Sequence, residues 1–127
     1  FGLERALEDL RSTIAVPGKL KVELSVFGLG DRLENKLEIA LYRMVQEMVS
    51  NALKHARADQ LTIQVTRSAG IVNLIVEDNG KGFDPTTAKE GMGLGNIRAR
   101  AAEFKGVVNV DSKAGRGTSI SIDIPLS

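Results

Sequence analysis

Two spacings of apolar residues alternate along the first half of the chain. Over residues 3–13 an apolar residue recurs every three or four positions, which predicts a short amphipathic helix. After the helix-breaking pair Pro17-Gly18, apolar and polar residues alternate over 20–26, as in a half-buried strand. The helical spacing returns over Glu34–Ala56 and predicts the longest helix. Its apolar stripe consists of Leu37, Leu41, Met44, Val45, Met48, Ala52, Leu53 and Ala56.

The second half of the chain predicts two β-hairpins with a loop and a helix between them. Apolar segments at 61–65 and 71–76 indicate the first hairpin, and 107–111 with 118–124 the second. The Gly-rich stretch over 79–92 predicts a mobile loop, and helical spacing returns from Gly93 to Lys105. This order predicts an α+β fold, a two-layer sandwich in which helices cover one face of a mixed, mainly antiparallel sheet.

Composition narrows the classes of function. A chain of 127 residues is expected to form one domain, and 17 Lys and Arg against 16 Asp and Glu give no basic footprint for nucleic acid. The absence of cysteine excludes disulfides, thiolate catalysis and cysteine-ligated zinc. No apolar run approaches the roughly 18 residues of a membrane span, so we expect a soluble, cytoplasmic chain without direct membrane contact. Because the chain begins with Phe1 and not Met, we expect it to be part of a longer protein.

The long predicted helix carries polar side chains at one regular spacing. Glu47, Asn51, Lys54 and His55 stand at i, i+4, i+7 and i+8 and are expected to project from one face. Carboxylate and amide oxygens suit Mg²⁺, and an ammonium one turn further suits phosphates. A solvated polar face explains the same spacing. His55 is either a base, metal ligand or phosphate acceptor, or a packed or solvent-facing ring near a helix end.

A carboxylate follows the strongly apolar strand of the first hairpin. Asp78 leads into Asn79-Gly80-Lys81-Gly82, so it lies where a strand gives way to a loop. A carboxylate there can accept a hydrogen bond from an adenine amine, and the glycines would let the backbone approach a flat base. A plain Asx turn accounts equally well for this sequence.

A second glycine cluster precedes the predicted helix over 93–105. The run Gly91-Met92-Gly93-Leu94-Gly95-Asn96 opens a helix N-terminus, where free amides and the helix dipole favour an anion such as phosphate. The run fits neither a P-loop nor a dinucleotide-binding fingerprint. A flexible loop before a helix is the alternative explanation.

Taken in order, these segments resemble the Bergerat-fold (GHKL) ATPases, and within them the catalytic ATP-binding domain of a bacterial sensor histidine kinase. The resemblance covers the whole chain and is closest to the nitrate- and desaturase-sensor-type kinases, which have a short ATP lid. It rests on four motifs, namely Glu47-(x3)-Asn51-Ala-Leu-Lys54-His55, Asp78-Asn-Gly80-Lys-Gly82-Phe83, Gly91-Met-Gly93-Leu-Gly95-Asn96 and Gly117-Thr118.

The resemblance implies a role for individual residues. Asn51 would hold Mg²⁺ with help from Glu47, Lys54 would meet phosphate oxygens, and His55 would flank the nucleotide. Asp78 would accept the adenine amine, supported by Thr118. The remaining implied nucleotide-binding residues are Gly80, Gly82, Gly91, Gly93, Leu94 and Gly95. Residues 81–90 would form the lid, and the separate phenylalanine box of larger-lid kinases is not found.

The resemblance also implies partners and an activity. The domain would bind ATP with Mg²⁺ and pass the γ-phosphate to a histidine on a separate dimerisation domain, with a response regulator downstream. Parent proteins of this kind are often membrane-anchored. The alternatives are another Bergerat-fold ATPase in which Glu47 activates water, an anti-sigma-factor serine kinase, and a nucleotide-free interaction module.

Overall fold

A computed structural model describes residues 2–56, 58–81, 94–113 and 115–126. Within them the elements follow the predicted order, with small shifts of the ends. They are α1 (Leu3–Ile14), β1 (Lys21–Phe27), α2 (Asn35–Asn51), the π-helical turn η1 (Ala52–Ala56), β2 (Gln60–Ser68), β3 (Ile71–Asp78), α3 (Leu94–Glu103), β4 (Val107–Lys113) and β5 (Gly117–Pro125). The mobile loop predicted over 79–92 lies outside the described residues from Gly82 onward.

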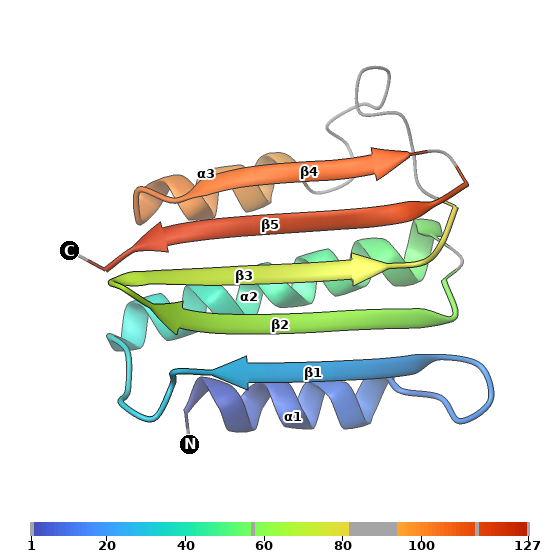
Figure 1. Cartoon of the computed structure of the whole chain (residues 1–127), viewed down its shortest axis with the longest axis horizontal. Coiled ribbons are helices and arrows are strands. Elements are labelled where there is room, and N and C mark those ends of the chain that lie inside the picture. Colours follow the sequence, from blue (N-terminus) through green and yellow to red (C-terminus); the bar gives the residue numbers. More distant parts are fainter. Residues whose placement is uncertain (1, 57, 82–93, 114, 127) are drawn as a thin grey trace.

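The strands form one five-stranded sheet in the order β1-β2-β3-β5-β4. Strands β1 and β2 pair in parallel, and the three other neighbouring pairs are antiparallel. A parallel pair needs a long crossover between its strands, and α2 with η1 provides it. The three α-helices lie behind the sheet as drawn in Figure 1. The predicted α+β two-layer sandwich is therefore confirmed.

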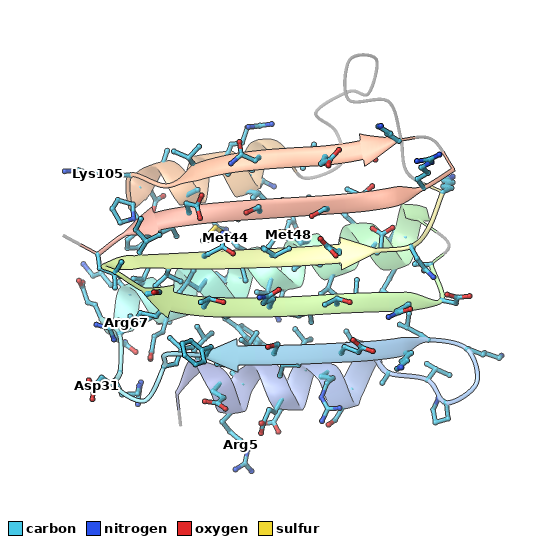
Figure 2. The ribbon with its side chains drawn as sticks, in the orientation of Figure 1. Arg5, Asp31, Met44, Met48, Arg67 and Lys105 are labelled. Carbon is cyan, nitrogen blue, oxygen red and sulfur yellow. The ribbon has the colours of Figure 1, made fainter. Side chains whose placement is uncertain are left out.

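The core lies between the sheet and the helices because side chains alternate between the two faces of each strand. In β3 the alternate residues Val72, Leu74 and Val76 are buried, and they face the apolar stripe of α2. Met44 and Met48 of that stripe are fully buried, and Figure 2 labels both on the helix behind the sheet. On the opposite face of the sheet, polar side chains of β3 and β5 form hydrogen bonds across the two strands.

The long helix departs from the prediction in its last turn. The α-helix ends at Asn51 and continues as a π-helical turn, whose i→i+5 hydrogen bonds make a wider turn. Residues beyond Asn51 therefore rotate less per residue than in an α-helix, and the apolar spacing no longer predicts their direction. Leu53, which the spacing assigned to the buried stripe, is 50% exposed. Its predicted burial is wrong.

A buried acid fixes the loop before α2. The guanidinium of Arg32 donates to both carboxylate oxygens of Glu38, with Nη2 to Oε1 at 2.6 Å and Nε to Oε2 at 3.0 Å. The backbone N–H of Leu33 is a third donor, at 3.2 Å from Oε2. The Arg32 hydrogen bond lowers the pKa of Glu38 below its ordinary value. This clamp holds the first turn of α2, where no side-chain cap is present on Glu34. None of the described helices is long and apolar enough to cross a membrane.

Candidate functional site

Asp78 is the last residue of β3, at the end of the sheet where the strand stops. It follows the buried Val76 by two positions, so its side chain faces the helical layer. Its partners in register are Leu61 on β2, which is fully buried, and Thr118 on β5. The carboxylate thus has an apolar neighbour on one side and a hydroxyl-bearing residue on the other.

The Asp78 carboxylate is hydrogen-bonded to the turn that follows it. The backbone N–H of Gly80, a buried residue, donates to Asp78 Oδ1 at 2.9 Å. Partial burial raises the pKa of Asp78 above its ordinary value, although the backbone N–H groups of Gly80 and Thr118 oppose the rise. The Asx turn therefore forms, and the carboxylate is also partly dehydrated. Such a carboxylate favours a donor group from a ligand, because it has lost part of its water.

Thr118 is held from the side away from Asp78. Its Oγ1 lies 2.8 Å from Oγ of Ser112, a buried residue directly opposite it on β4. The Ser112 Oγ also lies 3.2 Å from the carbonyl oxygen of Gly117, within hydrogen-bond distance. The resemblance implied that the Thr118 hydroxyl supports Asp78, and this stays a prediction.

Asn79 connects the end of β3 to the beginning of β2. Its Oδ1 accepts from the backbone N–H groups of Asp59 and Gln60 at 3.1 and 3.0 Å, and its Nδ2 donates to Asp59 Oδ1. Asp59 and Gln60 are thus tied to the residue after Asp78. These hydrogen bonds connect the motif that begins at Asp78 to the start of β2.

The four polar residues predicted to share one helix face lie in two different elements: two are in α2, and two are in the π-helical turn after it. Glu47 and Asn51 stand one α-helical turn apart near the end of α2, and both are half-buried. Lys54 is exposed in the π-helical turn, and the side chain of His55 lies outside the described residues. The α-helical spacing behind the predicted common face of these four residues ends at Asn51. The common position of Lys54 and His55 with the other two therefore stays a prediction.

These segments meet at one end of the molecule. Figure 1 shows α2 running behind the sheet in the direction of β3, so that its C-terminal end and Asp78 lie at the same end. The first residues of β5 begin there as well. Carboxylate, amide, hydroxyl and ammonium groups from separate segments are thus placed around this end of the sheet.

Two side chains at this end carry oxygen donors of the types that could hold a magnesium ion together with phosphates. Glu47 and Asn51 offer a carboxylate and an amide oxygen, which are the ligand types that Mg²⁺ takes beside waters and phosphate oxygens. Across the described ranges there is no group of three or more His, Cys, Asp or Glu side chains that could hold a metal ion by itself. Glu47 and Asn51 are only two donors, so they would need water or phosphate oxygens to complete the coordination of a magnesium ion.

The second glycine cluster is described only in part. Gly82, Gly91, Gly93 and most of the expected lid over 81–90 lie outside the described residues. Helix α3 begins at Leu94, which is buried, and Gly95 is exposed in its first turn. The helix predicted over this segment is confirmed from Leu94 onward. Its role toward phosphate stays a prediction.

Three residues around Asp78 were not assigned a role from the sequence, namely Asn79, Ser112 and Gly117. One sequence pattern points to Ser112, because it occupies the next helix-facing position after Val108 and Val110, where an apolar residue would be expected. Gly117 precedes Thr118 with a φ of +92°. Asn79 and Gly117 make their contacts between segments far apart in the sequence, whereas those of Ser112 lie within the hairpin of β4 and β5.

Comparison with known proteins gives consistent results. The profile of the family described as "Histidine kinase-, DNA gyrase B-, and HSP90-like ATPase" matches residues 36–127. The chain is 40% identical over 124 residues to the signal transduction histidine-protein kinase/phosphatase DegS of Bacillus subtilis (strain 168), covering 93% of the chain and 32% of that protein. It is 37% identical over 128 residues to DegS of Brevibacillus brevis, covering 100% of the chain and 33% of that protein. The chain thus spans about a third of the length of these relatives.

The chain is also similar in fold to solved structures of histidine kinases. A blue-light activated histidine kinase of Erythrobacter litoralis EL346 matches with a TM-score of 0.75 and 26% identity, over 98% of this chain and 41% of that one. The histidine kinase AdeS of Acinetobacter baumannii shares the fold, with a TM-score of 0.71 and 18% identity over 98% of this chain and 61% of that one.

Proposed function

Since the chain belongs to the histidine kinase-, DNA gyrase B- and HSP90-like ATPase family, we propose that residues 1–127 are the catalytic ATP-binding domain of a sensor histidine kinase in a two-component system. The observation that carries this proposal is the placement of Asp78 at the end of β3, partly buried and opposite Thr118. The relatives named above as histidine kinases support the choice of reaction. The domain would work as one part of a longer kinase.

Adenine recognition is assigned to Asp78. The exocyclic amine of adenine is a donor, and a carboxylate is an acceptor when ionised. Guanine presents a carbonyl oxygen at the corresponding position, which a carboxylate repels. The apolar neighbour Leu61 and the buried Gly80 make the surroundings of the carboxylate poor in water. The domain is therefore expected to prefer adenine nucleotides.

The phosphate end is assigned to the end of α2. Glu47 and Asn51 would hold Mg²⁺, and the exposed Lys54 would contact phosphate oxygens as a flexible point charge. When bound, the magnesium ion neutralises charge on the transferring phosphoryl group. The remaining task of these side chains is to hold the triphosphate in one orientation, so that an acceptor can approach the γ-phosphorus in line.

The acceptor is expected on another domain. His55 is the only histidine in the sequence, and it follows Asn51 by four residues on the segment that would bind the nucleotide. A histidine on a dimerisation domain would take the phosphoryl group and later pass it to a response regulator. Isolated chain is accordingly expected to form no stable phosphohistidine of its own.

A transfer assay tests this proposal. The chain is incubated with radiolabelled ATP and Mg²⁺, with and without a separately made dimerisation domain of a similar kinase. Acid-labile, base-stable label on the added domain is expected, and the Asp78→Asn variant should transfer far less. Stoichiometric label on His55 would contradict the proposal and make the chain a self-contained phosphocarrier.

The same assay separates the alternatives. Acid-stable label on a serine of an antagonist protein would indicate an anti-sigma-factor serine kinase. Release of inorganic phosphate without transfer would indicate another ATPase of the family. Absence of ATP binding in calorimetry would indicate an interaction module that has kept the fold.

A further inference from the structure

Ser112 is a buried polar residue to which the proposed reaction gives no task. It is 6% exposed and occupies the last position of β4 that faces the helices. Apart from the salt-bridged Glu38, it is the one residue among the buried positions in the described ranges that is polar. A buried hydroxyl is costly unless it is hydrogen-bonded, so its contacts indicate what it does.

The contacts of Ser112 lead toward Asp78. Ser112 is opposite Thr118 in the β4–β5 pair, and Thr118 is opposite Asp78 in the β3–β5 pair. The three residues therefore form one row across three strands on the face toward the helices. Residues directly opposite in antiparallel strands have Cβ atoms about 4.5–5.5 Å apart. The Thr118 side chain accordingly stands between the Ser112 hydroxyl and the Asp78 carboxylate.

The hydrogen bond between Ser112 and Thr118 fixes which way the threonine hydroxyl points. The two oxygens are 2.8 Å apart. Threonine outside a helix can exchange the positions of its hydroxyl and its methyl group by rotating about χ1. With Ser112 present, the rotamer that directs the methyl group at Ser112 loses this hydrogen bond.

Ser112 also sets the direction of the threonine O–H. Each hydroxyl has one proton. If the Ser112 proton goes to the Gly117 carbonyl oxygen, 3.2 Å away, Thr118 must donate to Ser112 and keeps only lone pairs for the pocket. If Ser112 donates to Thr118, the threonine proton is available to Asp78 or to a base. In both cases Ser112 decides what Thr118 offers.

We propose that Ser112 is a positioning residue for base recognition, which acts on Asp78 and the bound base through the hydroxyl of Thr118. This inference rests on the proposed function, since it names a further residue of the same site. Ser112 itself touches neither the nucleotide nor the reacting atoms.

The test compares two nucleotides that differ only at the recognised position. ATP carries the 6-amine, and inosine triphosphate carries a carbonyl oxygen in its place. Calorimetry of the chain with Mg²⁺ should show about three- to tenfold weaker ATP binding for Ser112→Ala, the loss of one neutral hydrogen bond. Inosine triphosphate binding should change little, so the ratio of the two affinities falls. Ser112→Thr, which keeps the hydroxyl, should restore the ratio.

A matched control distinguishes positioning from general loosening of the sheet. Ser121 lies on β5, on the opposite face, and its hydroxyl accepts from Asn73 Nδ2 at 3.1 Å. Ser121→Ala removes a cross-strand hydroxyl of the same kind and should leave the nucleotide ratio unchanged. In a Thr118→Val background, Ser112→Ala should have no further effect on the ratio, because the two residues act as one unit.

The possible outcomes separate this inference from the proposed function. If the natural chain binds both nucleotides equally, the assignment of Asp78 to adenine fails, and the inference fails with it. If the natural chain prefers ATP and Ser112→Ala keeps that preference, or weakens both nucleotides equally, only the role of Ser112 is overturned. Should Ser112→Ala not fold, Ser112→Cys, which has a similar volume and a weak hydrogen-bonding group, allows the same comparison.

Discussion

The backbone of Gly117 runs against the carbonyl group of Asp78, so closely that a β-carbon on Gly117 would overlap the Asp78 carbonyl oxygen. Gly117 also has a φ of +92°, which L-residues rarely adopt. Both features require glycine at this position. They place the next residue, Thr118, opposite Asp78 and so set the geometry of the site.

Substitution of Gly117 should damage both the fold and the site. For Gly117→Ala we expect a loss of more than about 2 kcal/mol in the free energy of unfolding, from backbone overlap and strained φ together. ATP affinity should also fall, because Asp78 must move. Urea unfolding and calorimetry measure the two effects.

Two other glycines are matched controls for this substitution. Gly115 has a φ of +84° and open space around it, so Gly115→Ala should cost only the strain of the backbone, about 1–2 kcal/mol. Gly28 has a φ of +85°, and a β-carbon added to it would overlap the carbonyl oxygen of Arg67. Arg67 lies at the end of the sheet away from Asp78 (Figure 2). Gly28→Ala should destabilise the fold and leave ATP affinity unchanged. Lower ATP affinity in Gly28→Ala would show that any loss of stability weakens the site.

Asp78→Asn should separate nucleotide binding from stability. A hydrogen bond to a charged group contributes roughly 1.5–3 kcal/mol, so ATP should bind about tenfold to a hundredfold more weakly. The melting temperature of the empty protein should be unchanged or higher, since a partly buried charge is removed. Equal ATP affinity in calorimetry would refute the assignment of Asp78.

The raised pKa of Asp78 gives this prediction a pH dependence. An acid whose pKa is higher in the folded protein than in the unfolded chain binds more protons when folded. As the pH rises above the ordinary value of 3.8, the natural protein therefore loses stability relative to Asp78→Asn. Unfolding curves of the two proteins between pH 4 and pH 7 should diverge in this direction, and convergence would contradict it.

The Arg32–Glu38 pair should give a pH dependence of the opposite sign. The pKa of Glu38 is lowered by Arg32, so its stabilising contribution is complete above the ordinary value of 4.5 and is lost as the pH falls through the lower folded value. Glu38→Gln should lower the melting temperature by several degrees at pH 7 and reduce this acid sensitivity. Glu8→Gln, which removes an exposed carboxylate from α1, should change little. A Glu38→Gln variant as acid-sensitive as the natural protein would disprove the role of the pair.

Exposure of Leu53 tests the π-helical turn. Leu53→Ala should change the free energy of unfolding by no more than about 0.5 kcal/mol, as for other exposed positions. Leu41→Ala, at a fully buried position on the same helix, should cost about 2–5 kcal/mol. If the two losses are similar, the helix continues as a regular α-helix and Leu53 lies in the core.

Periodicity by itself determined the elements and most of the core. The spacing of Leu3, Leu7 and the stripe of α2 depends only on which residues share a helical face, and this is a local property. The apolar segment over 71–76 likewise predicted a strand with Asp78 at its end, and the structure adds that Asp78 follows the inward-facing row of β3. Local hydrophobic patterning thus predicted the two-layer sandwich and the placement of the best candidate for base recognition.

Only the tertiary structure decided which residues surround that candidate. Leu61 and Thr118 lie opposite Asp78, and Ser112 lies opposite Thr118, because of strand order and register. These depend on packing between strands, and Asp78 and Thr118 are 40 positions apart in the sequence. The π-helical turn after Asn51 broke a spacing that was regular in the sequence, so Leu53 is exposed. Backbone geometry and cross-strand contacts leave no periodic trace in the sequence. Backbone geometry and cross-strand contacts arise when several strands pack together at once, and a local pattern of apolar residues does not predict that packing.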